Sequence, residues 1–364
     1  FDRRDHEFGA VVDVHPPRLG QPLLPALEQM PVLVPRICGV CSTAHHVAAV
    51  KALEDIYGVA PPPLALRLRE LLLLGQLIQN QATSLFLFTM PDRLHVDSLL
   101  LPSEASNAAA QAAIAQRALQ VRRAGTDLIT VAGGQFIHPV KAVVGGVTSG
   151  IEPAAAEDTR RKLETALPVA CALFDTYWEM SLALRERIGT WGDDAPTHYL
   201  TSVGDSRPDY TGSLLRVQDI TGALACTFSA RDWRLHLTSH ESEYSYAGHT
   251  SYKGEVLRAN SLARINMARR MGTPRADEYL ACFRAAFGRP AHGILLYDLC
   301  RGIELVYALE RALDLLAQPL VGETEVPYQP CDGEGYGLVE APRGPLIHQY
   351  RIERGLVADA HFVI

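Results

Sequence analysis

Positive charge is not in excess in this sequence. Its 364 residues include 34 lysines and arginines against 41 aspartates and glutamates, which gives a formal net charge of −7. Proteins that bind nucleic acid or an anionic membrane surface use clustered lysine and arginine. The arginines here are spread out, and the doublets Arg3-Arg4, Arg122-Arg123 and Arg269-Arg270 are typical of solvated faces. We therefore expect no nucleic-acid partner.

Cysteine is too sparse for a disulfide framework. There are seven, an odd number, and five of them are isolated in mostly apolar surroundings: Cys171, Cys226, Cys282, Cys300 and Cys331. Disulfide-rich secreted proteins have denser, even-numbered cysteines. The first ten residues, FDRRDHEFGA, lack the apolar stretch of a signal peptide and an initiator methionine. We expect a reducing, cytoplasmic compartment and a chain that need not start at its natural terminus.

No long apolar run is free of polar side chains. Residues 71–90 are uncharged and long enough to suggest a membrane helix. Polar residues interrupt them, and such groups are costly in lipid, among them Gln76, Gln79, Asn80, Gln81, Thr83 and Ser84. We expect a helix buried inside a large soluble protein, with no direct insertion into a membrane.

Repeats, low-complexity tracts and linkers are also lacking, so we expect one domain over residues 1–364. Hydrophobic periodicity and end signals predict helices separated by a glycine-rich loop at 131–150. The predicted helices cover 42–58, 64–90, 103–126, 153–188, 276–287 and 293–317. Strands are predicted at 9–15, in short pieces within 190–260, and in the last 32 residues, 333–364. The fold class is mainly α with small peripheral β-sheets, an α+β arrangement with long buried helices.

The stretch RICGVCSTAHH, residues 36–46, carries the clearest chemistry. Cys38 and Cys41 are a Cys-x-x-Cys pair, and soft thiolates suit zinc, iron–sulfur clusters, copper or nickel. With Ser42 as N-cap, the first turn of the following helix would stabilise thiolates through its free N–H groups and dipole. His45 comes four residues after Cys41, so that its ring lies on the same helical face.

Three interpretations of this stretch stay open from the residues alone. A structural zinc site needs four ligands, and His45 or His46 offers a third, but the chain has no second Cys-x-x-Cys. A redox dithiol of the thioredoxin kind would follow a strand in a βαβ pattern, which is not apparent. The remaining interpretation is a pair of buried, inert cysteines.

The same stretch fits R-x-C-G-x-C-x-x-x-H and resembles the first ligand motif of the large subunit of [NiFe]-hydrogenases. Further stretches resemble the family in the same order, so that the resemblance covers nearly the whole chain. The third of them resembles the soluble, cytosolic group linked to NAD(P) or deazaflavin. These stretches are LRELLLLGQLIQNQATSLFLFTMPD, GGQFIHPVKAVVGGV, GEVLRANSLARINMARRMGTPRADE and GEGYGLVEAPRGPLIHQY.

The resemblance implies a bundle of buried helices around a nickel–iron centre, with carbon monoxide and cyanide on iron. Cys38 would be a terminal nickel ligand, Cys41 would bridge nickel and iron, and His45 would donate to the Cys41 sulfur. Arg343 matches the arginine poised over the metals, and Glu340 is a candidate for orienting it. The reaction would be the reversible splitting of H₂ into protons and electrons.

The resemblance leaves the path of protons open. Asn80, followed by Gln81, occupies the position where many membrane-bound relatives carry an acidic residue, and amides hydrogen-bond but do not relay protons as carboxylates do. Glu7 is a poor match for the early proton-path glutamate. GEGYG, residues 333–337, lacks a full nucleotide-binding motif, and we interpret it as a turn that shapes the Arg343 loop.

Electrons are expected to leave through iron–sulfur clusters in a small partner subunit, because this chain has no cysteines to hold its own. Further electron-transfer subunits, NAD(P)- or deazaflavin-linked, are implied, and the family also binds a structural magnesium. H₂ and protons would be the substrates.

The family's second ligand motif, Asp-Pro-Cys-x-x-Cys-x-x-His, has no counterpart before Ile364. We hold three hypotheses: an active subunit of which this is the ordered part, an immature form without metal, and a non-catalytic scaffold that holds zinc at Cys38, Cys41 and His45. The first, a catalytic large subunit conditional on a second cysteine pair outside these residues, is the main prediction.

Overall fold

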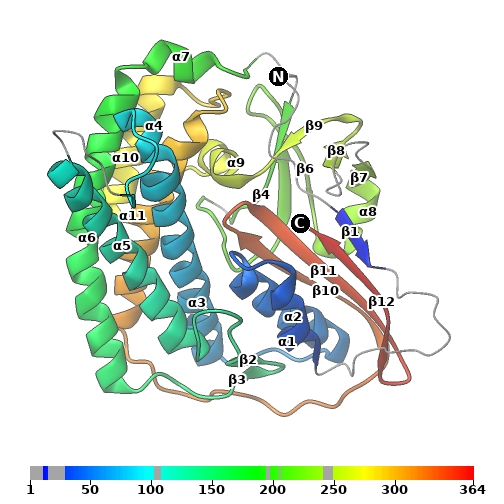
Figure 1. The fold of residues 1–364 in the computed structure, drawn as a ribbon. Helices are drawn as coiled ribbons and strands as arrows, with labels where there is room; N and C mark the ends of the chain where they lie inside the picture. Colours follow the sequence, from blue (N-terminus) through cyan, green and yellow to red (C-terminus); the bar gives the residue numbers. More distant parts are fainter. Residues whose placement is uncertain (1–10, 15–28, 102–107, 194–196, 205, 241–248) are drawn as a thin grey trace.

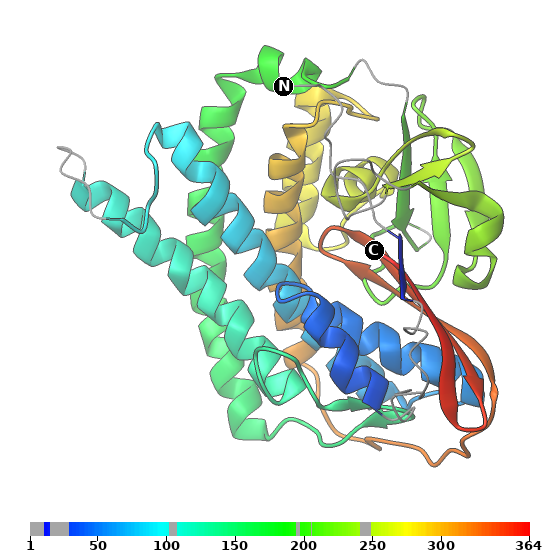
Figure 2. The same cartoon turned by 45° about the vertical axis from the view of Figure 1, so that its right-hand side comes forward.

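The computed structural model describes residues 11–14, 29–101, 108–193, 197–204, 206–240 and 249–364. A bundle of long helices forms one side of the molecule, and the two larger β-sheets lie on the other side (Figure 1). Between them lies α2, Ser42–Tyr57, which packs against the hairpin formed by residues 333–353 (Figure 2). The predicted fold class is confirmed. Of the strand predicted at 9–15, residues 11–14 are described and form a strand. Glu7 and the predicted start of the helix at 103 do not fall in the described residues.

The bundle consists of α3 (Pro63–Ala82), α5 (Ala108–Gly133), α6 (Pro153–Leu182) and α11 (Leu296–Leu316). Helix α11 packs against both α3 and α6, and α5 packs between α3 and α6. Their leucine, isoleucine and alanine side chains form the main hydrophobic core of the protein. Burial of this apolar surface is the dominant favourable term in folding, and it makes the bundle a rigid base for the site.

Helix α3 continues through a π-helical turn, Thr83–Thr89, into α4, Met90–Leu94. Among the described residues, this Pro63–Leu94 segment is the helix whose length and composition would allow it to cross a membrane, but 72% of its most apolar window is buried inside the protein. The hydroxyls of Thr83 and Thr89 bond carbonyls four residues earlier. The interpretation of this segment as a buried helix is confirmed.

The helices depart from the prediction at three places. Helix α5 runs to Gly133 rather than 126, because Leu128, Ile129 and Ala132 are buried in the main core. The helix predicted at 153–188 breaks after Leu182 and restarts as α7, Arg185–Thr190. The prediction also missed α9, Asn260–Met267, whereas α10, Pro274–Phe287, was expected.

Two larger sheets lie on the side of the molecule away from the helical bundle, and the first of them packs against α2. The first has the order β1-β12-β11-β10 and is antiparallel throughout. Its strands are β1 (Val11–Val14), β10 (Gly333–Ala341), β11 (Gly344–Glu353) and β12 (Leu356–Val363). Strands β10 and β11 form a two-residue hairpin, in which Ala341 pairs with Gly344 and Arg343 lies at the tip. GEGYG is therefore part of strand β10, and its interpretation as a turn was wrong.

The second sheet has six strands in the order β6-β5-β4-β9-β8-β7, with β4 and β9 parallel. The strands are β4 (Thr197–Ser202), β5 (Leu215–Gln218), β6 (Leu224–Phe228), β7 (Leu237–His240), β8 (His249–Tyr252) and β9 (Glu255–Arg258). The short strands predicted within 190–260 thus belong to one sheet. Short elements complete the described fold: α1 (Met30–Leu33), η2 (Val34–Ile37), η4 (Ala230–Asp232), α8 (Trp233–His236), β2 (Ala142–Val143) and β3 (Gly146–Val147).

The glycines of GEGYG allow α2 to lie directly on β10. A Cβ on Gly337 would come within 1.9 Å of the Ala48 carbonyl oxygen, and one on Gly335 within 2.4 Å of the Ala52 carbonyl oxygen. No real side chain tolerates such distances, so these positions require glycine. This contact fixes the helix that carries Cys41 relative to the strand that leads to Arg343.

Replacing Gly337 by alanine should lower the free energy of unfolding by about 1–3 kcal/mol, because α2 must move away from β10. Urea denaturation measures the change. Gly150→Ala is the matched control, since a Cβ there meets nothing within 4 Å. Equal stability of the two variants would contradict the close packing described here.

Candidate metal centre

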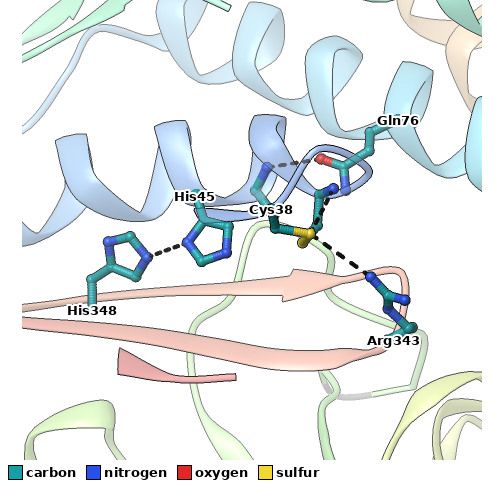
Figure 3. Close-up of a disulfide and its surroundings, with 7 residues drawn as sticks. Cys38, His45, Gln76, Arg343 and His348 are labelled. Atoms are coloured by element: carbon teal, nitrogen blue, oxygen red, sulfur yellow. Dashed lines mark hydrogen bonds between the residues drawn. A yellow bond between two sulfur atoms is a disulfide. The ribbon is translucent and has the colours of Figure 1, made fainter. Parts of the chain in front are cut away.

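Cys38 and Cys41 lie on the loop that leads into α2. Cys38 follows η2, and Cys41 is the N-cap residue of α2, with its carbonyl accepting the His45 N–H at 3.2 Å. The prediction of Ser42 as N-cap was wrong by one residue. A side chain from α3 takes over the capping role, because Gln76 Oε1 accepts the backbone N–H of Ala44 at 2.8 Å. The helical bundle thereby holds the loop that carries both cysteines (Figure 3).

The two sulfur atoms are bonded to each other as a disulfide in this structure. The Cys41 backbone N–H also donates to Cys38 Sγ at 3.2 Å. A ligand role requires the reduced pair, because the thiolate is the form that binds metal. The free N–H groups and the dipole of the first turn of α2 favour that negative charge.

Arg343 reaches this sulfur pair from the opposite end of the sequence. Its Nη2 lies 3.8 Å from Cys38 Sγ, as Figure 3 shows. A cavity of about 340 Å³ lies between the hairpin tip and the N-terminus of α2. Its lining includes the predicted residues Cys38, Cys41, His45, Asn80 and Arg343, together with Asn260 and apolar side chains such as Leu200, Leu257 and Leu346. The structure therefore brings these five predicted residues together.

His45 is the third member of the group. One of its ring nitrogens and the two sulfurs lie within 4.8 Å of one another, the one such group of potential ligands found among the described residues. Its Nδ1 shares a hydrogen bond with Nε2 of His348 at 2.9 Å, and its Nε2 is buried without a hydrogen-bond partner. Burial lowers the pKa of His45 to about 4, so the ring is neutral near pH 7. His46 points elsewhere and bonds the Pro31 carbonyl at 2.8 Å.

Gln81 does not line the cavity, although its neighbour Asn80 does. Its Nε2 donates to Glu304 at 2.6 Å, inside the bundle. The two amides therefore face different environments, because consecutive helical residues point about 100° apart. Asn80 faces the cavity, whereas Gln81 belongs to a buried charged network.

That network is centred on Arg264, which is fully buried in α9. Its guanidinium pairs with Glu304 of α11, with Nη2 at 3.0 Å from Oε2, and with Glu340 of β10 at 2.7 Å. It also donates to the carbonyl oxygens of Ala341 at 3.2 Å and Pro342 at 2.7 Å. Arg264 thus donates hydrogen bonds to the backbone of both residues that precede Arg343 in the hairpin.

Glu340 was predicted to orient Arg343. The contacts found for its carboxylate are to other residues, Arg264 and Ser202. Its carboxylate accepts from Arg264 and from the Ser202 backbone N–H at 2.7 Å. Burial raises its pKa to about 7, while Arg264 acts in the opposite direction. Any effect of Glu340 on Arg343 would pass through the hairpin backbone.

Sequence reasoning missed Arg264 and Glu304, although a signal was present. Glu304 is a carboxylate within one of the long helices that were predicted to be buried. A buried carboxylate requires a cation and hydrogen-bond donors. The donors are Arg264, Gln81, Ser261 at 2.7 Å and the Tyr210 hydroxyl at 3.0 Å. His348 and Tyr350, on β11, were not singled out either.

Arg264→Gln should lower the free energy of unfolding by about 3–5 kcal/mol, because Glu304 and Glu340 would stay buried without a counter-charge. Chemical denaturation measures the effect. Arg160→Gln is the control: Arg160 pairs with Glu157 and Glu164 on the surface of α6, where the loss of such a pair changes stability little. A loss in Arg264→Gln as small as that of the control would show that the network does not stabilise the fold.

Comparison with known proteins identifies the family. A model of the nickel-dependent hydrogenases matches residues 27–117, the segment that carries both cysteines. The chain is 31% identical over 353 residues to one subunit of the F420-non-reducing hydrogenase vhu of Methanococcus voltae, covering 93% of this chain and 82% of that protein. It is 28% identical to the beta subunit of the NAD-reducing hydrogenase HoxS of Cupriavidus necator, covering 92% of this chain and 74% of that one.

The fold agrees with these relatives. A crystal structure of NAD⁺-reducing [NiFe]-hydrogenase in the H₂-reduced state superimposes with a TM-score of 0.83 at 26% identity, over 93% of this chain and 78% of that one. The [NiFeSe]-hydrogenase of Dm. baculatum shares the fold, with a TM-score of 0.69 at 19% identity. This chain belongs to the nickel-dependent hydrogenases, as a large subunit of the [NiFe] type.

Proposed function

We propose that this chain is the H₂-activating subunit of a [NiFe]-hydrogenase and catalyses H₂ ⇌ 2H⁺ + 2e⁻. One observation carries the proposal. In a chain of this family, the sulfurs of Cys38 and Cys41 and the guanidinium of Arg343 meet at one cavity, with Arg343 Nη2 at 3.8 Å from Cys38 Sγ. Segments some three hundred residues apart converge there.

The residues present fit one side of a nickel–iron centre. As thiolates, Cys38 and Cys41 are soft ligands of the kind that nickel and iron accept; Cys38 would hold nickel, and Cys41 would hold both nickel and iron. The buried, unpartnered Nε2 of His45 offers a polar contact beside them. When bound, the centre, with carbon monoxide and cyanide on iron, supplies the Lewis acid that polarises H₂. The complete centre needs two further thiolates, which the described residues do not supply at this site.

Arg343 contributes a fixed positive charge. A guanidinium stays protonated in proteins, so it stabilises negative charge on the nearby Cys38 sulfur and on a reacting group in the cavity. Leu200, Leu257 and Leu346 line the cavity on which this charge acts, while Arg343 itself is exposed to solvent. An electrostatic interaction is stronger beside such apolar walls than in bulk water. Arg264 keeps this charge in place through the backbone of Ala341 and Pro342.

The electrons would leave through a small iron–sulfur subunit. Apolar side chains beside the cysteine loop support the proposal: Val32, Leu33, Ile37 and Val40 are 45%, 41%, 46% and 50% exposed. Exposed apolar side chains that gather in one place mark interaction surfaces. The proposal also includes further subunits, linked to NAD(P) or deazaflavin, beyond the small one. It includes a structural magnesium and a cytoplasmic location as well.

Nickel analysis of the complex purified from its natural host, combined with H₂-dependent reduction of a viologen dye, tests the function. We expect about one nickel per large subunit, and loss of both nickel and H₂ uptake in Cys38→Ser and Cys41→Ser. Cys282→Ser, at an exposed and isolated cysteine, is the control and should retain both. Zinc without nickel, together with no H₂ uptake by the unaltered complex, would overturn the proposal in favour of the zinc-binding scaffold.

Arg343→Gln should lower kcat for H₂ uptake about 100-fold to 1,000-fold, as the loss of a charge or donor directed at a reacting group does. The nickel content should stay the same, because this side chain is exposed at the hairpin tip and is not a ligand. Turnover and nickel are measured on the same preparation. Full activity of the variant would show that the guanidinium has no part in the reaction.

A further inference from the structure

Three rings form a hydrogen-bonded line that leads toward the sulfur pair. The Tyr350 hydroxyl lies 2.6 Å from His348 Nδ1, and His348 Nε2 lies 2.9 Å from His45 Nδ1. All three side chains are fully buried, at 0% exposure. In Figure 3 the His45 ring has His348 on one side and the sulfurs on the other. The remaining nitrogen, His45 Nε2, has no hydrogen-bond partner.

The two members of this line that lie away from the sulfurs are uncharged near neutral pH. Burial lowers the pKa of His348 well below its usual range. Burial also raises the pKa of the Tyr350 phenol well above its usual range. A neutral imidazole has one N–H and one acceptor nitrogen, so the line has only two possible directions.

In the first direction, every bond has one donor and one acceptor. The Tyr350 O–H donates to His348 Nδ1, the His348 Nε2–H donates to His45 Nδ1, and the His45 Nε2–H faces the sulfurs. In the second direction, the His45 Nδ1–H donates to His348 Nε2, and the His348 Nδ1–H donates to the Tyr350 oxygen. The Tyr350 O–H then lacks the one acceptor described for it, and the His45 Nε2 lone pair faces the sulfurs.

The first direction is lower in energy. Leaving a buried hydroxyl proton without an acceptor costs about 1–3 kcal/mol. A lone pair directed at a thiolate adds electrostatic repulsion, whereas an N–H directed at it makes a charge-assisted hydrogen bond. Both effects favour the same tautomer of His45.

We propose that Tyr350 and His348 are positioning residues that hold His45 as the Nε2–H tautomer, so that it donates a hydrogen bond to a sulfur of the Cys38–Cys41 pair. The inference rests on the proposed function, in which that sulfur is a metal thiolate. In this tautomer Nε2 has no lone pair for a metal, so His45 is a donor and not a third zinc ligand. Each bond in the line also polarises the next, which strengthens the final N–H···S bond.

Infrared spectra of the purified complex test this through the carbon monoxide and cyanide bands of the iron. A hydrogen bond to a thiolate ligand withdraws electron density from the metal and keeps these bands at higher wavenumber. Tyr350→Phe removes the first donor and should shift the bands to lower wavenumber with unchanged nickel content. Tyr199→Phe is the control, because it also removes a buried hydroxyl from a histidine, His292, 2.6 Å away, in a pair outside this line.

Two substitutions of His348 separate positioning from packing. Glutamine places an amide N–H where His348 Nε2 donates, so His348→Gln should keep the bands near their normal positions. His348→Leu removes the donor and should shift them as Tyr350→Phe does. The Gln variant thus rescues the donor without the imidazole, and a loss of packing alone would affect both substitutions.

The outcomes are distinguishable. Bands that stay in place in Tyr350→Phe and His348→Leu, or that move equally in the Gln and Leu variants, would overturn the tautomer proposal and leave the hydrogenase function intact. The absence of any carbon monoxide or cyanide band in the unaltered complex would overturn the proposed function and this inference with it.

Discussion

A fully buried guanidinium joins the helical bundle to the hairpin that carries Arg343. Arg264 of α9 pairs with Glu304 of α11 on one side and with Glu340 of β10 on the other. Taking these charges out of water is costly, and the cost is offset only while each keeps its partners. The hairpin tip therefore has little freedom to move without breaking the network, and Arg343 is presented to the cavity at a fixed place.

The opposite wall of the cavity is fixed by different physics. Gly335 and Gly337 let α2 lie against β10, and Gln76 of α3 caps the first turn of α2. Close packing and one hydrogen bond thus hold the loop with Cys38 and Cys41. Because β10 belongs to both arrangements, the distance between the sulfurs and the guanidinium is set by one strand. This explains how residues from both ends of the chain form a single site.

Local patterns predicted the parts of the site whose chemistry depends on near neighbours in sequence. Cys38, Cys41 and His45 have a spacing that indicates soft-metal chemistry by itself, and the long helices are marked by apolar periodicity. The family resemblance added Arg343, which no spacing rule identifies. The structure then placed all four at one cavity with Asn80, whereas the ligand roles of the cysteines stay a prediction.

What could not be predicted depends on partners distant in sequence. Helix α9 was missed because Ser261, Arg264 and Asn266 suggest a solvated segment, yet all three are buried. The glycines of GEGYG suggested a turn, and only the presence of α2 explains them in a strand. The line from Tyr350 through His348 to His45 joins β11 to α2, about 300 residues apart.

Nickel-edge X-ray absorption of the complex purified from its natural host, under H₂, tests the central claim most directly. The account predicts nickel coordinated mainly by sulfur, with iron as a close neighbour, and loss of this signal in Cys38→Ser. Nickel bound by nitrogen and oxygen alone, or no nickel at the site, would contradict it.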